Sequence, residues 1–216
     1  MSADQINVLK TYLNQIENDI ITITNVEDKH EFKFLNYECG LILEIFLNGD
    51  YKEIPYENNK ILIDIGANVG DTPIYFANKG YTVYAFEPLP HIANIAKKNL
   101  ELNHHVKDKI TYINKAVSCK TGKLTVHYDE SNTGGAGSYN NSETKIEVET
   151  LTLEDIIKEF NIKPDILKMD CEGCEVGIIK NSDLSYFSQV IFEYHTGMTG
   201  TNENILIDIL KDKDSN

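Results

Sequence analysis

Residues 60–80 read KILIDIGANVGDTPIYFANKG, and this segment gives the clearest indication of the fold. The run Ile61–Ile65 is almost continuously apolar and rich in β-branched residues, which is typical of a strand buried on both faces of a parallel sheet. Gly66 and Gly70 follow, and they allow a tight turn and a close approach of the main chain to a ligand. The stretch therefore predicts a buried strand that leads into a ligand-binding turn.

A helix is predicted directly after this turn. Thr72 suits its N-cap, Pro73 its first helical position, and Gly80 the position just past its end. A strand, a glycine turn and a helix in this order favour a pocket for an adenosine nucleotide or for S-adenosylmethionine (AdoMet) over other kinds of site.

The composition is that of an ordinary globular protein, with 41% hydrophobic and 25% charged residues in a chain of 216. This length fits one compact unit, in which we expect an N-terminal cap over residues 1–59 and a ligand-binding domain over residues 60–216. The N-terminus is polar, and no apolar run approaches the roughly 20 residues that span a bilayer. We therefore expect a cytoplasmic protein without a membrane partner.

The charge argues against a nucleic-acid partner. The formal net charge is −14, and every one of the 20 residues counted as basic is a lysine. A polyanion is repelled overall, and the arginine fork that reads phosphates and guanines is missing. Methylation of a nucleic acid is for this reason a weak alternative.

The four cysteines give one motif, Cys171-Glu172-Gly173-Cys174. The spacing is that of a redox pair or of half a zinc site, but no second pair completes a metal site. A thioredoxin-like role needs the pair at a helix start in a suitable fold. We therefore interpret these cysteines as reduced thiols in or near the core.

The rest of the chain alternates predicted helices and strands. Helices are expected over residues 3–18, 39–47, 90–102, 152–160 and 202–210, and core strands over 81–86, 110–113, 166–169 and 190–192. Shorter strand pairs are expected over 20–24 with 31–35 and over 123–128 with 145–151. The glycine-rich segment 129–138 is interpreted as a flexible loop or as a mobile lip over a pocket. Strands that alternate with helices predict an α/β sheet.

Polar residues follow each core strand: Asp64 and Asn68, Glu87, Asn114, Asp170 with Glu172, and Glu193 with His195. The carboxyl ends of the strands in an open α/β sheet meet at one crevice, so these side chains are expected to form one site. Glu87 lies about 20 residues past the glycine turn, the spacing at which an acidic residue binds ribose hydroxyls.

The turn also limits the kind of cofactor. It is neither the Gly-x-Gly-x-x-Gly fingerprint of dinucleotide-binding proteins nor a P-loop with its lysine, which weakens the NAD and ATP interpretations. An acidic crevice favours a ligand with a positive sulfonium over one with a pyrophosphate.

Four segments resemble the signatures of the FkbM-type methyltransferases: Asp64–Thr72, Ala85–Pro88, Leu167–Glu175 and Phe192–His195. The intervening Lys115–Ser118 resembles that family as well, and the segments occur in the family's order over residues 60–195. The resemblance implies a Rossmann-like class I AdoMet-dependent sheet with the predicted helix and hairpin cap. It also implies methylation of a hydroxyl on a small metabolite, sugar or glycan.

By position, the resemblance assigns roles to individual residues. The AdoMet loop would follow Asp64 and consist of Gly66, Ala67, Asn68 and Gly70, and Thr72 would touch the AdoMet carboxylate. The ribose would be held by Glu87 with Pro88, and the adenine would be flanked by Asn114, Lys115 and Ala116. Asp170 would lie near the methionine part of AdoMet. Members of this family normally continue past the last helix with an antiparallel strand pair, whereas the sequence here ends at Asn216. A sheet without that pair would keep an open edge, which favours pairing, so a homodimer is one expected form.

A hydroxyl acceptor needs a group that removes its proton, and His195 and Glu172 are the base candidates. A divalent cation on Asp170, Glu172 and Glu193 is a weaker alternative, and the favoured interpretation uses no metal. Two other functions stay open: an NAD-linked oxidoreductase and a non-catalytic AdoMet-binding module.

Overall fold

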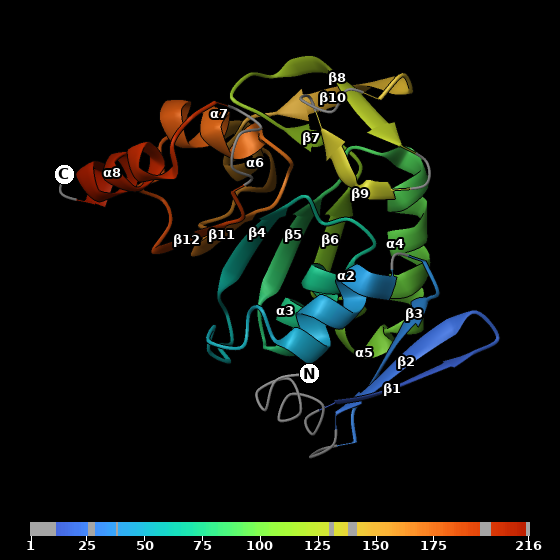
Figure 1. The fold of residues 1–216 in the computed structure, drawn as a ribbon. Helices are drawn as coiled ribbons and strands as arrows, with labels where there is room; N and C mark the ends of the chain where they lie inside the picture. Colours follow the sequence, from blue (N-terminus) through green and yellow to red (C-terminus); the bar gives the residue numbers. More distant parts are fainter. Residues whose placement is uncertain are drawn as a thin grey trace.

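A computed structural model describes residues 12–25, 29–37, 39–129, 132–137, 142–194 and 200–214. Its centre is a parallel sheet in the order β12-β11-β4-β5-β6 (Figure 1). The bounds of these strands are β4 (Ile61–Ile65), β5 (Thr82–Phe86), β6 (Ile110–Ile113), β11 (Ile166–Met169) and β12 (Gln189–Phe192). All five predicted core strands are confirmed, and the sheet is Rossmann-like.

Helices cover both faces of this sheet. One face packs against α3 (Asp71–Asn78), α4 (Pro90–Leu102) and α5 (His104–Lys107), and the other against α6 (Leu153–Phe160), α7 (Cys174–Asn181) and α8 (Glu203–Asp214). Successive strand residues point to opposite faces, so Leu62 joins the first core and Ile63 the second. The predicted last helix exists but runs four residues further than expected, to Asp214.

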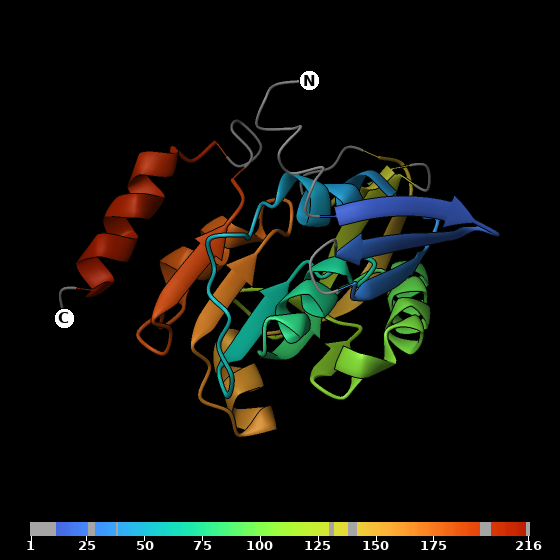
Figure 2. The same ribbon diagram turned by 90° about the horizontal axis from the view of Figure 1, so that it is seen from below.

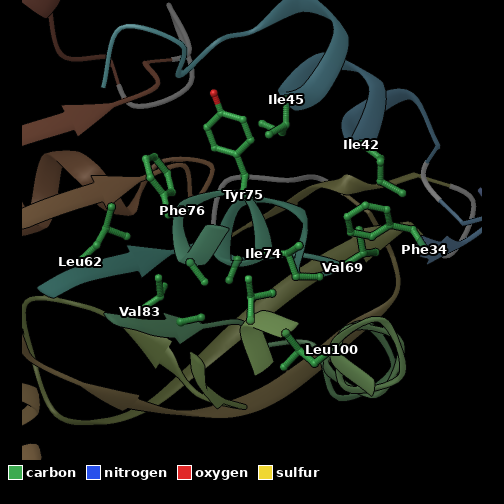
Figure 3. Packing of buried hydrophobic residues seen from close by; sticks show 14 of the residues in the cluster. Phe34, Ile42, Ile45, Leu62, Val69, Ile74, Tyr75, Phe76, Val83 and Leu100 are labelled. Carbon is green, nitrogen blue, oxygen red and sulfur yellow. The ribbon is translucent and has the colours of Figure 1, made fainter. Parts of the chain in front are cut away.

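The core around α3 joins the sheet to the N-terminal part of the chain (Figure 3). Ile74 and Phe76 of α3 belong to one buried cluster with Leu62 and Val83 of the sheet. Phe34, Ile42 and Ile45 reach the same cluster from segments that precede the sheet. The first face of the sheet is therefore covered in two layers, first by α3 and then by the N-terminal segments.

Those N-terminal segments form a three-stranded antiparallel sheet, β1 (Tyr12–Glu17), β2 (Ile20–Asn25) and β3 (Glu31–Leu35), followed by α2 (Cys39–Leu43) and the π-helix η1 (Glu44–Asn48). The predicted pairing of β2 with β3 is confirmed. The predicted helix over 3–18 is wrong for Tyr12–Glu17, and its earlier part lies outside the described residues. Asn18 and Asp19 both have positive φ, 50° and 61°, and they connect β1 and β2 as a two-residue hairpin turn.

Asn99 of α4 and Asn103, the C-cap of that helix, hold β3 in place, and Figure 2 shows the N-terminal sheet beside α4. Asn103 accepts from the Lys33 amide at 3.1 Å and donates to its carbonyl at 2.7 Å. Asn99 is fully buried, accepts from the Leu35 amide at 2.8 Å and donates to the Val69 carbonyl at 2.8 Å. One side chain thus connects the N-terminal sheet to the glycine turn.

A second sheet, in the order β7-β10-β8-β9, lies beyond the carboxyl ends of β4, β5 and β6 (Figure 1). Its strands are β7 (Ala116–Val117), β8 (Gly122–Asp129), β9 (Asn132–Gly137) and β10 (Lys145–Leu151). The antiparallel pairing of β8 with β10 confirms the predicted strand pair. The loop expected over 129–138 is wrong for Asn132–Gly137, which pairs with β8, because glycines permit an edge strand when main-chain partners are available.

Helix caps give one confirmation and one correction. Thr152 caps α6 through a capping box with Asp155, as predicted. Thr72 is not the cap of α3: that helix begins at Asp71 after Gly70, whose φ is 87°. Pro73 is accordingly the third helical residue. Gly80 follows the C-cap Lys79 with a φ of 106°, as expected.

Within the described part of the chain, no helix has both the length and the apolar character needed to cross a bilayer.

Candidate functional site

The candidate site lies where the chain order of the sheet reverses. From β4 the chain proceeds outward to β5 and β6, and it then returns to the other side of β4 to form β11 and β12. Ligands of open α/β sheets bind at the carboxyl ends of the strands at such a reversal. The segments at this point are the glycine turn after β4 and the segment that begins with Asp170 after β11.

The glycine turn fits closely against the segment after β11. Gly66 has a φ of 81°, and a Cβ at this position would lie 1.7 Å from the Asp170 carbonyl oxygen. The amides of Gly66 and Ala67 both donate to the Phe86 carbonyl at 3.0 Å. The position therefore requires glycine, and the turn is fixed to both neighbouring strands.

Asn68 and Glu87 are connected at the next step of the turn. The Asn68 amide donates to Glu87 Oε2 at 3.2 Å, and the Leu89 amide donates to Glu87 Oε1 at 2.9 Å. Burial raises the pKa of Glu87 to about 7, and these two amides act in the opposite direction. Each carboxylate oxygen has a further lone pair, so ribose hydroxyls could still bind there.

Asn68 itself offers a buried acceptor. Its φ is 38°, and its carbonyl accepts a hydrogen bond from the Tyr112 hydroxyl. Its side-chain Oδ1 is buried and has no hydrogen-bond partner among the described residues. Buried polar atoms are rarely left unpaired, so this oxygen is a candidate contact for a ligand donor.

A buried ion pair lies beneath the turn. Asp64 and Lys168 oppose each other in the register of β4 and β11, and Asp64 Oδ1 lies 3.0 Å from Lys168 Nζ. The Thr72 hydroxyl donates to Asp64 Oδ2 at 2.6 Å. This bond explains why Thr72 does not cap α3. It also places Asp64 in the interior rather than on the surface of the crevice.

Two further ionisable side chains lie within electrostatic range of this pair. Burial raises the pKa of Asp71, the first residue of α3, to about 6, while the Lys168 charge lowers it. Tyr51 comes from the N-terminal region, and burial raises the pKa of its phenol, with Lys168 acting in the opposite direction. Sequence reasoning missed Lys168, Asp71 and Tyr51.

The other side of the turn is apolar. A cavity of about 40 Å³ lies between the parallel sheet, the second sheet and the start of α7, and its lining residues include the predicted Gly66, Pro88 and Ala116. The remaining lining residues are Ile65, Phe86, Val117, Leu124, Val126, Cys171 and Cys174. Ligand pockets usually measure roughly 300–1,000 Å³, so this cavity can hold only part of a ligand.

Cys171 and Cys174 form a disulfide, which corrects the expectation of reduced thiols. The turn between them brings the sulfurs together, with a Cα–Cα distance of 5.5 Å. Glu175 lies close to both sulfurs, but its carboxylate accepts the amides of Cys171 at 2.7 Å and Gly173 at 2.9 Å. The two sulfurs are bonded to each other and the Glu175 oxygens accept hydrogen bonds, so we assign no metal to these three residues.

The remaining predicted residues are placed differently. The Asn114 side chain donates to the carbonyls of Glu87 at 2.8 Å and Pro88 at 3.0 Å, so it supports the loop after β5. Lys115 pairs with Glu149 of the second sheet at 3.1 Å. Glu172 lies in the turn before α7 with a φ of 54°. His195 lies outside the described residues.

Comparisons with known proteins give the class. The methyltransferase FkbM domain matches residues 64–214. Methyltransferase 1 of Beauveria bassiana is 26% identical over 78% of this chain and 74% of its own length. Methyltransferase sdnD of Sordaria araneosa is also 26% identical, over 79% of this chain and 81% of its own length. Hexuronic acid methyltransferase AglP of Haloferax volcanii is 23% identical over 66% of this chain and 59% of its own length.

Among solved structures, the methyltransferase FkbM from Methylobacillus flagellatus has a TM-score of 0.42 and 18% identity, over 66% of this chain and 38% of that one. The sheet and the sequence relatives together define a methyltransferase built on a Rossmann-like sheet. The chain belongs to the FkbM methyltransferase family.

Proposed function

We propose that this enzyme transfers a methyl group from AdoMet to a hydroxyl oxygen of a small metabolite, sugar or glycan. The observation that carries the proposal is the contrast across the glycine turn, with buried carboxylates on one side and an apolar cavity on the other. When bound, AdoMet supplies an electrophilic methyl group on a positively charged sulfur.

The residues at the turn fit such a cofactor. Asp170 Oδ2 lies 3.9 Å from Lys168 Nζ, and its side chain keeps 33% of its surface exposed, so it can still receive a cationic group. The apolar wall around Phe86 and Ala116 suits a flat base. Asn68 Oδ1 offers an acceptor to an amine or hydroxyl donor.

A hydroxylated acceptor is supported by one relative, whose name describes a hexuronic acid methyltransferase. A sugar hydroxyl reacts as a nucleophile only when its proton is removed, and such a base typically contributes about 10²–10⁴-fold to the rate. Glu172 and His195 remain our proposed bases, since both follow core strands in the sequence.

Titration calorimetry with AdoMet, S-adenosylhomocysteine and NAD tests the cofactor assignment. Two aspartates flank β11 and give a matched pair of variants: Asp170 after the strand at the proposed site, and Asp165 before it, paired with Lys60 at 2.6 Å. We expect Asp170→Asn to weaken AdoMet binding by about tenfold through loss of a charge-assisted contact. Asp165→Asn should leave it unchanged.

AdoMet should also lose more affinity than S-adenosylhomocysteine in Asp170→Asn, because only AdoMet carries the sulfonium charge. Binding of NAD with no binding of either sulfur compound would overturn the proposal. Incubation with labelled AdoMet and hydroxylated sugars then separates an enzyme from a non-catalytic binding module, since a binding module transfers no label.

A further inference from the structure

Two lysine side chains are buried among the described residues, Lys168 at 1% exposure and Lys79 at 4%. Burying an ammonium is costly unless charges or hydrogen bonds compensate for the lost water. The two lysines are compensated in different ways and at opposite ends of α3. This difference separates a structural lysine from one that bears on the cofactor.

Lys168 lies where the site segments meet. Its ammonium is 3.0 Å from Asp64 Oδ1 and 3.9 Å from Asp170 Oδ2, and it donates to the Gly66 carbonyl at 3.2 Å. These three acceptors come from the end of β4, the glycine turn and the end of β11. The ammonium therefore connects the two segments between which a ligand of this sheet would bind.

The carboxylates of Asp64 and Asp170 favour the ionised form of Lys168. Burial lowers the pKa of Lys168, but Asp64, Asp170 and the Tyr51 phenol together outweigh it and raise that pKa above its usual value. Asp71 and Glu87 also interact electrostatically with this ammonium. The carboxylates around this lysine therefore favour its ionised form.

We propose that Lys168 is a positioning residue for the methyl donor: it balances Asp64, fixes the Gly66 carbonyl, and holds the glycine turn at a set distance from the Asp170 carboxylate. The inference rests on the proposed AdoMet function. Lys168 does not itself touch the cofactor in this arrangement. It acts by keeping Asp170 oriented and the turn closed against β11.

Lys79 supplies the matched control. Its ammonium donates to the carbonyls of Tyr51 at 2.9 Å, Lys52 at 3.3 Å and Ile54, and it lies 5.0 Å from the Tyr75 ring centre. It occupies the C-terminal end of α3, away from the glycine turn. Its loss should destabilise the fold without changing the cofactor site.

The experiment compares Lys168→Met with Lys79→Met by calorimetry with AdoMet and S-adenosylhomocysteine, at a temperature where thermal melts show both variants folded. We expect Lys168→Met to weaken binding of both ligands by about 10- to 100-fold, because Asp170 and the glycine turn lose the charge-assisted contacts that hold them in position. Lys79→Met should bind within about twofold of the unaltered protein. Lys168→Arg, which keeps the charge, should recover part of the affinity.

If Lys168→Met does not fold, the double variant Asp64→Asn with Lys168→Met serves instead. It removes both buried charges, and the Gly66 carbonyl loses the hydrogen bond from Lys168. Its affinity should fall as in the single variant. Unchanged affinity in either folded variant, or an equal loss in Lys79→Met, would overturn the proposal. Failure of the unaltered protein to bind AdoMet or S-adenosylhomocysteine would instead overturn the proposed function.

Discussion

The two faces of the parallel sheet differ most at the carboxyl ends of β4 and β11. On the face toward α3, Asp64 and Lys168 form a buried ion pair. On the face toward α7, Ile65 and Met169 join an apolar core that ends at the Cys171–Cys174 disulfide. The same two strands supply both, because neighbouring strand residues point in opposite directions.

Because of this contrast, the segment around one turn can bind a ligand that has both a charged and an apolar part. Charged groups are collected on one side without being exposed, since the pair is buried among Thr72, Gly66 and the first turn of α3. Apolar groups on the other side need no compensation. A ligand with a cationic end and a flat apolar end would meet the partly exposed Asp170 carboxylate on one side and the apolar cavity on the other.

The largest effect on stability is expected when one member of the Asp64–Lys168 ion pair is removed. Asp64→Asn should lower the free energy of unfolding by about 3–5 kcal/mol, because it leaves the buried Lys168 ammonium with the Gly66 carbonyl and, as its nearest carboxylate, the more distant Asp170. Chemical denaturation measures this change. The matched variant Asp165→Asn breaks the partly exposed pair with Lys60 and should cost much less, because water screens that pair. Equal losses would mean that burial of the Asp64–Lys168 pair is not what matters.

A second test measures how the free energy of unfolding depends on pH. Burial raises the pKa of Glu87 from 4.5 to about 7, so the folded protein binds a proton that the unfolded chain has released between these values. Stability from this group is complete below pH 4.5 and is lost as the pH rises through 7, by at most about 3 kcal/mol. Asp71, with a pKa of about 6, contributes in the same direction.

Denaturation curves between pH 5 and pH 8 measure this slope. Glu87→Gln removes the titration and should flatten the curve, whereas Glu101→Gln on the exposed surface of α4 should leave it unchanged. A slope that is identical in both variants would show that Glu87 does not titrate in this range.

The smallest expected effect is on the apolar side. Reducing the Cys171–Cys174 disulfide opens a short loop, and the chain-entropy model gives a loss of about 2 kcal/mol in the free energy of unfolding. Thermal melts with and without a dithiol reductant measure it. The double variant Cys39→Ser with Cys119→Ser, which removes the two free cysteines, should keep the full response to the reductant. A response that disappears there would assign the effect to the free thiols.

The sheet could be predicted because its strands are short apolar runs separated by clear turns, as in Ile61–Ile65 and Ile166–Met169. The N-terminal strand β1 could not, since its spaced apolar residues suit a helix as well and only the Asn18-Asp19 turn distinguishes the two. The cap of α3 was misassigned because the hydroxyl of Thr72 has a stronger partner, Asp64, brought near by the fold.

The site was predicted as a set of strand ends, but its central cation was missed. The signal was present: Lys168 and Asp64 are the charged residues inside two apolar strands, and neighbouring strands can pair them. Register decides whether they meet, and a single sequence does not specify it. The disulfide was missed for a similar reason, because spacing alone does not distinguish a bonded pair from two separate thiols.

Asn99 makes the N-terminal sheet a direct support of the glycine turn, although the two are far apart in the sequence. Through this one amide, the Leu35 main chain and the Val69 carbonyl share a partner. A protease cut or a deletion that removes β3 would therefore remove a support of the glycine turn, and under the proposed function the shortened protein should lose affinity for AdoMet before its parallel sheet unfolds.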